Sequence, residues 1–215
     1  MRQHAARPFT LIELIVVMGV MMLLAAVAIP AYSSLFSGRK TTLAANKMNA
    51  AVMEARAHAV SAKVYTALVF VKDKSTSRGY TSFRMAEVYH NPDAESGYKW
   101  RRWAPGSSFV LLPENTMIPD GDDNLGTTSN GSEGNKGSGN VPTISDLDAN
   151  SGVDGGDAPA IVFKPNGQLA GTGDKNVVVR FVEANRYEAN QSQTPKLPLN
   201  INWLTCKTKF LDPVQ

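Results

Sequence analysis

The feature that most constrains this chain is an apolar run of membrane length that contains a single carboxylate. From Phe9 to Ile29 every side chain is apolar or glycine except Thr10 and Glu13. At a rise of 1.5 Å per residue, these residues would extend roughly 30 Å as a helix, which matches the hydrocarbon core of a bilayer. The sequence therefore predicts a transmembrane helix over residues 9–30.

The basic residues around this run predict its orientation. Arg2 and Arg7 precede it, whereas Arg39 and Lys40 follow only after a further helical stretch. The positive-inside rule then places the N-terminus in the cytoplasm and the C-terminal part outside. A competing interpretation is a cleaved secretory signal, because residues 26–28 read Ala-Val-Ala.

Insertion of the Glu13 carboxylate into a bilayer would cost free energy, so Glu13 predicts a positively charged partner. An acidic residue at the centre of a membrane helix costs about 2.5–3.5 kcal/mol on insertion scales. No Lys or Arg lies within the run. If the chain were cut before Phe9, the new α-amino group would lie four residues from Glu13, and a neighbouring copy's Glu13 could pair with it. A partnerless carboxylate that reaches the interface is the alternative.

The stretch PFTLIELIVVMGVMMLLAAVAIPAY resembles the N-terminal signal and helix of type IV prepilins and type II secretion pseudopilins. Counted from Phe9, Glu13 is the fifth residue and Pro30 the twenty-second, as in those families. The resemblance implies a leader at residues 1–8, cleavage by a prepilin peptidase between Pro8 and Phe9, N-methylation of Phe9, and assembly through Glu13 and Pro30.

The same resemblance implies the partners and the location. The partners would be other pilin or pseudopilin subunits, an inner-membrane assembly platform and membrane lipid. The location would be the bacterial inner membrane, crossed once, with a periplasmic head that joins a filament after assembly. One departure is that the family has glycine before the cut, where this chain has Pro8. Proline fixes φ and lacks an N–H, and an uncut chain would remain an anchored monomer.

The rest of the chain predicts an α+β protein. Residues 31–63 keep a helical period, with an apolar face at Ala44, Met48, Val52, Ala55, Ala59 and Ala62. Residues 64–215 carry β-branched and aromatic segments separated by turns, such as VYTALVFVK and NVVVRFVEA. We therefore expect a pilin-like fold: a long N-terminal helix, whose first half spans the membrane, packed on an antiparallel β-sheet head.

The head resembles the GspH/FimT type of minor pseudopilin. The resemblance rests on MNAAVMEARAHAVSAKVYTALVF, LLPENTMI, IVFKPNGQL and INWLTCKTKF. Some proteins of the FimT type take up DNA through basic residues near the C-terminus, where this chain has Lys207 and Lys209. A DNA-uptake receptor is therefore an alternative function, although the family's arginines are missing and we do not expect nucleic acid as the main partner.

Residues 120–157 are rich in Gly, Asn, Ser and Asp and predict a long surface loop. Nine acidic residues and one lysine lie between Pro113 and Ala160, so this part of a chain of net charge +3 is strongly acidic. Within it, the oxygen ligands Asp146, Asp148, Asn150 and Asp157 have spacings reminiscent of a calcium loop, although Ser151 stands where an EF-hand has glycine. Calcium is the one cofactor that the sequence suggests, and a solvated loop without metal is the alternative.

No catalytic motif is present, since the chain lacks a P-loop, HExxH, GxSxG and CxxC pattern. None of the three histidines is spaced as a partner for a nucleophile. The sequence thus predicts a non-enzymatic minor pseudopilin or pilin-like subunit, with a non-polymerising anchored binding protein as a further alternative.

Overall fold

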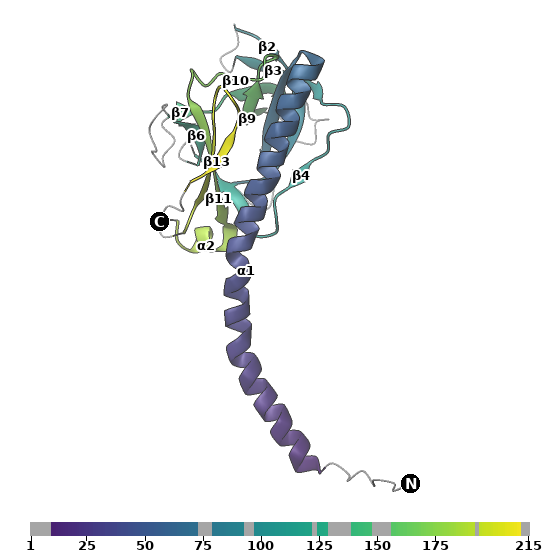
Figure 1. Ribbon diagram of the computed structural model, residues 1–215, viewed down its shortest axis with the longest axis vertical. Coiled ribbons are helices and arrows are strands. Elements are labelled where there is room, and N and C mark those ends of the chain that lie inside the picture. Colours follow the sequence, from purple (N-terminus) through teal and green to yellow (C-terminus); the bar gives the residue numbers. More distant parts are fainter. Residues whose placement is uncertain are drawn as a thin grey trace. The chain divides into compact units, whose positions relative to one another are not determined.

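The structure is a computed structural model that describes residues 10–72, 79–92, 97–121, 124–128, 139–147, 156–191 and 194–211 (Figure 1). Within the first helix, side chains are described for residues 11–26 and 39–62. The chain divides into two compact units, Met1–Arg39 and Lys40–Gln215, which are treated separately below. This boundary falls inside the segment 31–63 that the sequence assigned to a single amphipathic stretch.

Two helices are described. Helix α1 (Leu11–Ala62) begins immediately after Thr10 and contributes to both units. Helix α2 (Ala184–Ala189) is a short segment that buries Tyr187 against Met117 and Val182. The predicted leader 1–8 and Phe9 lie outside the described residues, as does the side chain of Pro30. Among the residues described, no helix has both the length and the apolar composition that a membrane crossing requires.

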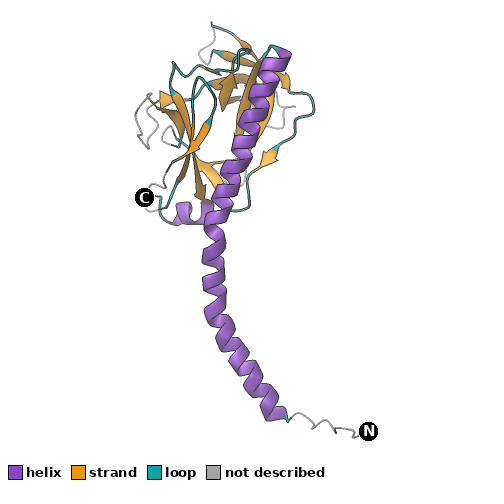
Figure 2. Ribbon diagram, in the orientation of Figure 1, coloured by secondary structure: helices purple, strands orange, loops and turns teal. Residues whose placement is uncertain are grey.

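The second unit contains thirteen strands that form one connected sheet (Figure 2). They are β1 (Tyr65–Lys72), β2 (Gly79–His90), β3 (Tyr98–Trp103), β4 (Val110–Leu111), β5 (Thr116–Pro119), β6 (Leu125–Thr128), β7 (Gly139–Asn140), β8 (Thr143–Leu147), β9 (Gly156–Phe163), β10 (Leu169–Ala170), β11 (Asn176–Glu183), β12 (Leu197–Ile201) and β13 (Thr208–Phe210).

Five of these strands close into a ring. The pairing order β1–β9–β8–β3–β2 returns to its start, because β2 also pairs with β1. All of these pairs are antiparallel except β3 with β8, which are parallel. One face of the ring strands is filled mainly by small and β-branched side chains: Ala67, Val69, Ala86, Val88, Ile144, Ala158, Ala160 and Val162. Small residues allow the strands to curve around a narrow interior.

The opposite face of the same strands packs on residues 40–62 of α1. The side chains alternate along each strand, so Leu68 and Phe70 on β1 point away from the ring interior. They join Phe83, Ile161 and Phe163 in a core that includes the buried helix positions Ala44, Met48, Val52, Ala55 and Ala59. Five of the six helix positions predicted for this face are thus buried, whereas Ala62 is exposed.

The predicted α+β class is wrong, because the structure is mostly β. Among the described residues, more belong to the thirteen strands than to the two helices. The prediction of a simple antiparallel sheet fails as well, since the sheet closes on itself and contains a parallel pair. The physical reason is that β1, β2 and β9 carry apolar residues on both faces, so a single helix layer could cover only half of that surface.

The predicted loop at residues 120–157 is also wrong in its described part. That part contains β6, β7, β8 and the start of β9. Leu125 and Val141 contribute to the core beneath α1, and Ile144 and Leu147 to the ring interior. The acidic, glycine-rich composition of the segment concealed these short strands, each of which places only one or two apolar side chains in a core.

Candidate assembly surface

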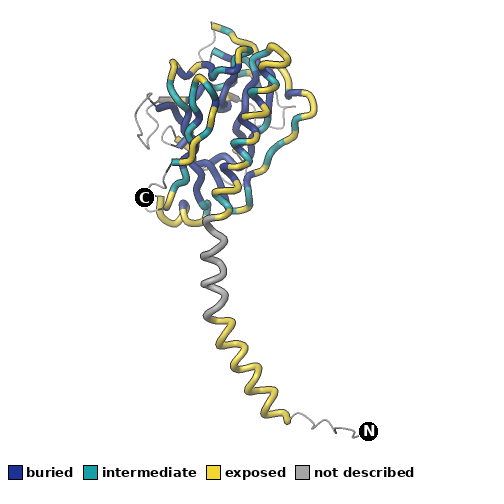
Figure 3. The backbone as a smooth tube through the Cα atoms, viewed as in Figure 1, coloured by how far each residue is buried: buried dark blue, intermediate teal, exposed yellow. Residues whose placement is uncertain are grey.

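The first unit presents an apolar helix with no covering layer among the described residues. All side chains from Leu11 to Ala26 are exposed (Figure 3). Twelve of them are large and apolar, with exposed fractions between 46% at Val17 and 76% at Leu11. Continuous apolar surface of this size marks a site for lipid or for another protein.

Glu13 lies at the start of this helix and forms a capping box with Thr10. Its Oε2 accepts hydrogen bonds from the Thr10 main-chain N–H at 2.9 Å and from the Thr10 hydroxyl at 2.8 Å. The Glu13 N–H in turn donates to Thr10 Oγ1 at 3.3 Å. Such reciprocal bonds satisfy main-chain groups that a helix leaves unpaired in its first turn.

The capping box gives Glu13 a role that the pairing hypothesis did not include. The sequence signal for it was the spacing Thr-x-x-Glu before an apolar run, which is a known helix start. Both hydrogen bonds from Thr10 use Oε2, and Glu13 Oε1 accepts no hydrogen bond from any described residue. One carboxylate oxygen therefore retains its capacity to accept a donor from another molecule.

The outer face of residues 40–62 carries a second apolar pattern. Its exposed positions follow alternating steps of three and four residues: Leu43, Asn46, Ala50, Met53, Ala57 and Val60. Steps of three and four are the spacing of a helix-to-helix seam, and a polar residue within such a seam favours one register over others. Helix α1 is thus apolar on the face that it buries in the head and on part of the face that it exposes.

The other predicted site residues do not form one cluster: some lie on different elements, and others lie outside the described residues. Pro8 and Phe9 are outside, so the structure places neither side of the predicted cleavage point. Lys207 lies in the turn before β13 and Lys209 on β13, and both are exposed. On β3, Trp100 and Trp103 contact each other with ring centroids 6.2 Å apart.

The predicted calcium ligands are only partly described. Asp148 and Asn150 lie outside the described residues, while Asp146 and Asp157 are on β8 and β9. Asp146 forms an ion pair with Lys99 at 2.9 Å, so a base already neutralises it. Within the described ranges, no group of three or more potential metal ligands converges.

A cluster of charged side chains around the buried Glu87 was not anticipated from the sequence. Glu87 on β2 is 2% exposed, and its carboxylate receives Arg102 Nε at 2.8 Å and Arg102 Nη2 at 3.2 Å. Arg101 Nη1 lies 3.6 Å from Oε2, and His58 Nε2 on α1 lies 3.3 Å from Oε1. The Arg102 hydrogen bonds hold the pKa of the Glu87 carboxyl below its usual range, against the opposing effect of burial.

A β-bulge explains why strand alternation missed this cluster. Glu87 pairs with Arg102 and Val88 with Trp100, so Arg101 is the extra residue on β3. A bulge changes which side chains share a face, and here it brings two consecutive arginines to one carboxylate. The cluster joins the end of α1 to the ring strands, and its polar groups are engaged with one another.

Comparison with known proteins adds no family assignment. No protein-family model, no curated protein and no solved structure matches this chain. The main evidence for function is therefore the uncovered apolar helix and the capping box at Glu13.

Proposed function

We propose that this chain is a membrane-anchored minor pseudopilin or pilin-like subunit that assembles into a filament through its N-terminal helix. The observation that carries the proposal is the continuous exposure of apolar side chains from Leu11 to Ala26. The anchor would be residues 9–30, with the N-terminus in the cytoplasm and the head in the periplasm. The described side chains cover only part of this run.

The free energy gained by burying these apolar side chains favours association of the helix with lipid or protein over its exposure to water. Full burial of one large aliphatic side chain contributes about 1.5–3 kcal/mol. Twelve such side chains in the first unit are at least 46% exposed, so their burial would contribute on the order of 10 kcal/mol even at half of that value. Lipid before assembly and neighbouring helices after assembly are the two environments that supply this burial.

Glu13 would set the axial register of the assembled helices. Its free Oε1 could accept an α-amino group from a neighbour whose leader has been removed, while Oε2 stays in the capping box. Hydrogen bonds to a charged donor are roughly twice as strong as neutral ones, which favours a single register over a sliding contact. The capping box would hold the Glu13 carboxylate in one orientation before the neighbour's α-amino group binds.

Mass spectrometry of the N-terminus tests whether that partner exists. The full chain would be expressed in a bacterium with an active prepilin peptidase and recovered from its membranes. We expect a chain that begins at a methylated Phe9. An intact leader in the same cells, beside a processed control pilin, would overturn the assembly proposal and leave a tethered monomer.

Two substitutions at one position separate the charge of Glu13 from its capping role. Glutamine can complete a capping box, so Glu13→Gln removes the charge and keeps the cap, whereas Glu13→Ala removes both. We expect both variants to insert into the membrane and to be recovered in sheared filaments at least tenfold less than the parent chain. Normal recovery of Glu13→Gln would show that only the cap matters and would refute the register argument.

A further inference from the structure

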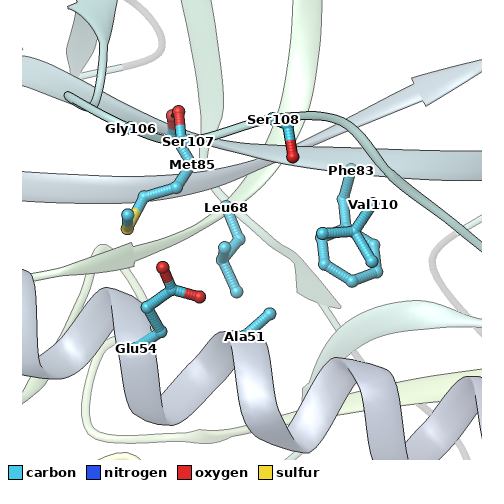
Figure 4. Close-up of a pocket in the computed structure, with 9 residues that line it drawn as sticks. All are labelled: Ala51, Glu54, Leu68, Phe83, Met85, Gly106, Ser107, Ser108 and Val110. Atoms are coloured by element: carbon cyan, nitrogen blue, oxygen red, sulfur yellow. Dashed lines mark hydrogen bonds between the residues drawn. The ribbon is translucent and has the colours of Figure 1, made fainter.

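A small pocket opens between residues 51–54 of α1 and the segment that follows β3. Its volume is about 100 Å³. A cavity of about 150 Å³ holds one benzene molecule, so this pocket has room for an apolar group of about four carbons. Its floor is apolar and largely buried, and its rim is polar: Ala51, Leu68, Phe83, Met85 and Val110 form the floor, and Glu54, Gly106, Ser107 and Ser108 the rim (Figure 4).

The rim segment is fixed by hydrogen bonds, so the pocket exists before any ligand arrives. The Ser107 hydroxyl donates to the Met85 carbonyl at 3.0 Å, and Arg84 Nη2 donates to the Ser107 carbonyl at 2.9 Å. The Arg84 guanidinium also lies over the Trp103 ring, 4.6 Å from its centroid. Preformed small pockets bind without the cost of ordering a loop.

The charge of the pocket comes from Glu54. Figure 4 shows its side chain rising from α1 toward the space between Met85 and Leu68. Glu54 has no hydrogen bond or ion pair with any described residue. Arg84, the nearby base, is directed to Ser107 and to the aromatic rings of Trp103 and Phe109. A cation at the rim would therefore find a carboxylate that no described base neutralises.

We propose that this pocket binds a short primary alkylammonium group, with its hydrocarbon tail on the apolar floor and its nitrogen at Glu54. The volume limits the buried tail to about four carbons, with the nitrogen at the rim, which excludes aromatic bicycles and sugars. The carboxylate excludes anions by repulsion, and an uncharged alcohol of the same length would lose the ion pair. The proposal does not depend on filament assembly.

Binding is tested on the full chain in detergent by NMR of methyl-labelled methionines, with n-butylammonium as the probe. The Met85 signal, identified by Met85→Leu, reports on the pocket, and the buried Met117 outside it serves as an internal reference. We expect a saturable shift of Met85 with a dissociation constant on the order of millimolar, as suits five heavy atoms. The Met117 signal should stay in place.

Three controls at constant ionic strength decide whether the ammonium is recognised. n-Butanol should bind at least threefold more weakly than n-butylammonium, and Glu54→Gln should weaken n-butylammonium to the same extent. Glu114→Gln, which removes an exposed carboxylate that does not line the pocket, should bind as the parent chain does. Equal affinity for the alcohol, an unchanged affinity in Glu54→Gln, or no saturable shift of Met85 would each overturn the proposal.

Discussion

Replacing Glu87 with glutamine should destabilise the head, because the substitution preserves the shape of the side chain and removes the buried charge that two partly exposed arginines contact. The carboxylate is 3% exposed and accepts two hydrogen bonds from Arg102. An amide could accept only one of these, and its NH₂ group would face a second donor. Hydrogen bonds to charged groups contribute about 1.5–3 kcal/mol, so we expect a loss of about 2 kcal/mol.

Thermal unfolding followed by circular dichroism measures this loss. For a domain of 150–250 residues, 1 kcal/mol corresponds to roughly 2–4 °C, so the melting temperature should fall by about 4–8 °C. Glu188→Gln is the matched control, since Glu188 is exposed on α2 and a surface change of this kind stays within about 0.5 kcal/mol. Equal melting temperatures for the two variants would refute the stabilising role of the cluster.

The pH dependence gives the same prediction an independent check. The pKa of Glu87 is lowered in the folded chain, first by its hydrogen bonds to Arg102, so its contribution is fully present above the ordinary glutamate pKa of about 4.3. It is lost as the pH falls through the lowered folded-state pKa. The stability difference between the parent chain and Glu87→Gln should therefore shrink as the pH falls below 4. A difference that grows below pH 4 would contradict the sign of the shift.

Three further predictions concern the head. Burial raises the pKa of the Cys206 thiol to about 11, and its Sγ lies 3.2 Å from the Gly167 carbonyl oxygen. A disulfide reagent at pH 8 should therefore label Cys206 only after denaturation in guanidinium. Rapid labelling of the native chain would contradict this prediction. Gly171→Ala should cost about 1–3 kcal/mol more than Gly106→Ala in chemical unfolding, because both have positive φ but only Gly171 has side chains where a Cβ would lie; equal costs would count against the packing there. Deletion of residues 121–156 should abolish cooperative unfolding, because it removes β6, β7 and β8, and a retained transition would show that these strands are dispensable.

The sequence predicted most of the individual elements, because their patterns are local. The apolar positions of α1 from Ala44 to Ala59 and the strands β1, β2, β3 and β11 follow the periods of helix and strand. The spacing of Thr10 and Glu13 predicts the capping box, which the hypothesis of a charge pair between Glu13 and a neighbouring copy did not include. The exposed seam from Leu43 to Val60 follows the same helical spacing, so the sequence predicts it as well as it predicts the buried face of the helix.

What the sequence could not predict depends on pairing between distant segments. Closure of the ring needs β3 beside β8 and β9 beside β1, and each pair joins residues at least 45 positions apart. The Glu87 cluster needs a bulge that only the paired strands reveal.

The acidic segment shows why composition was misleading about its structure. Its charged and glycine residues are typical of loops, yet short strands need few apolar residues when neighbouring strands supply the rest of the core. β8 buries Ile144 and Leu147 in the ring, and exposes Asp146 to pair with Lys99. Asp146, one of the acidic residues that suggested a solvated calcium loop, thus lies on the exposed face of β8, and the strand's structural contribution comes from the two apolar residues between which Asp146 stands.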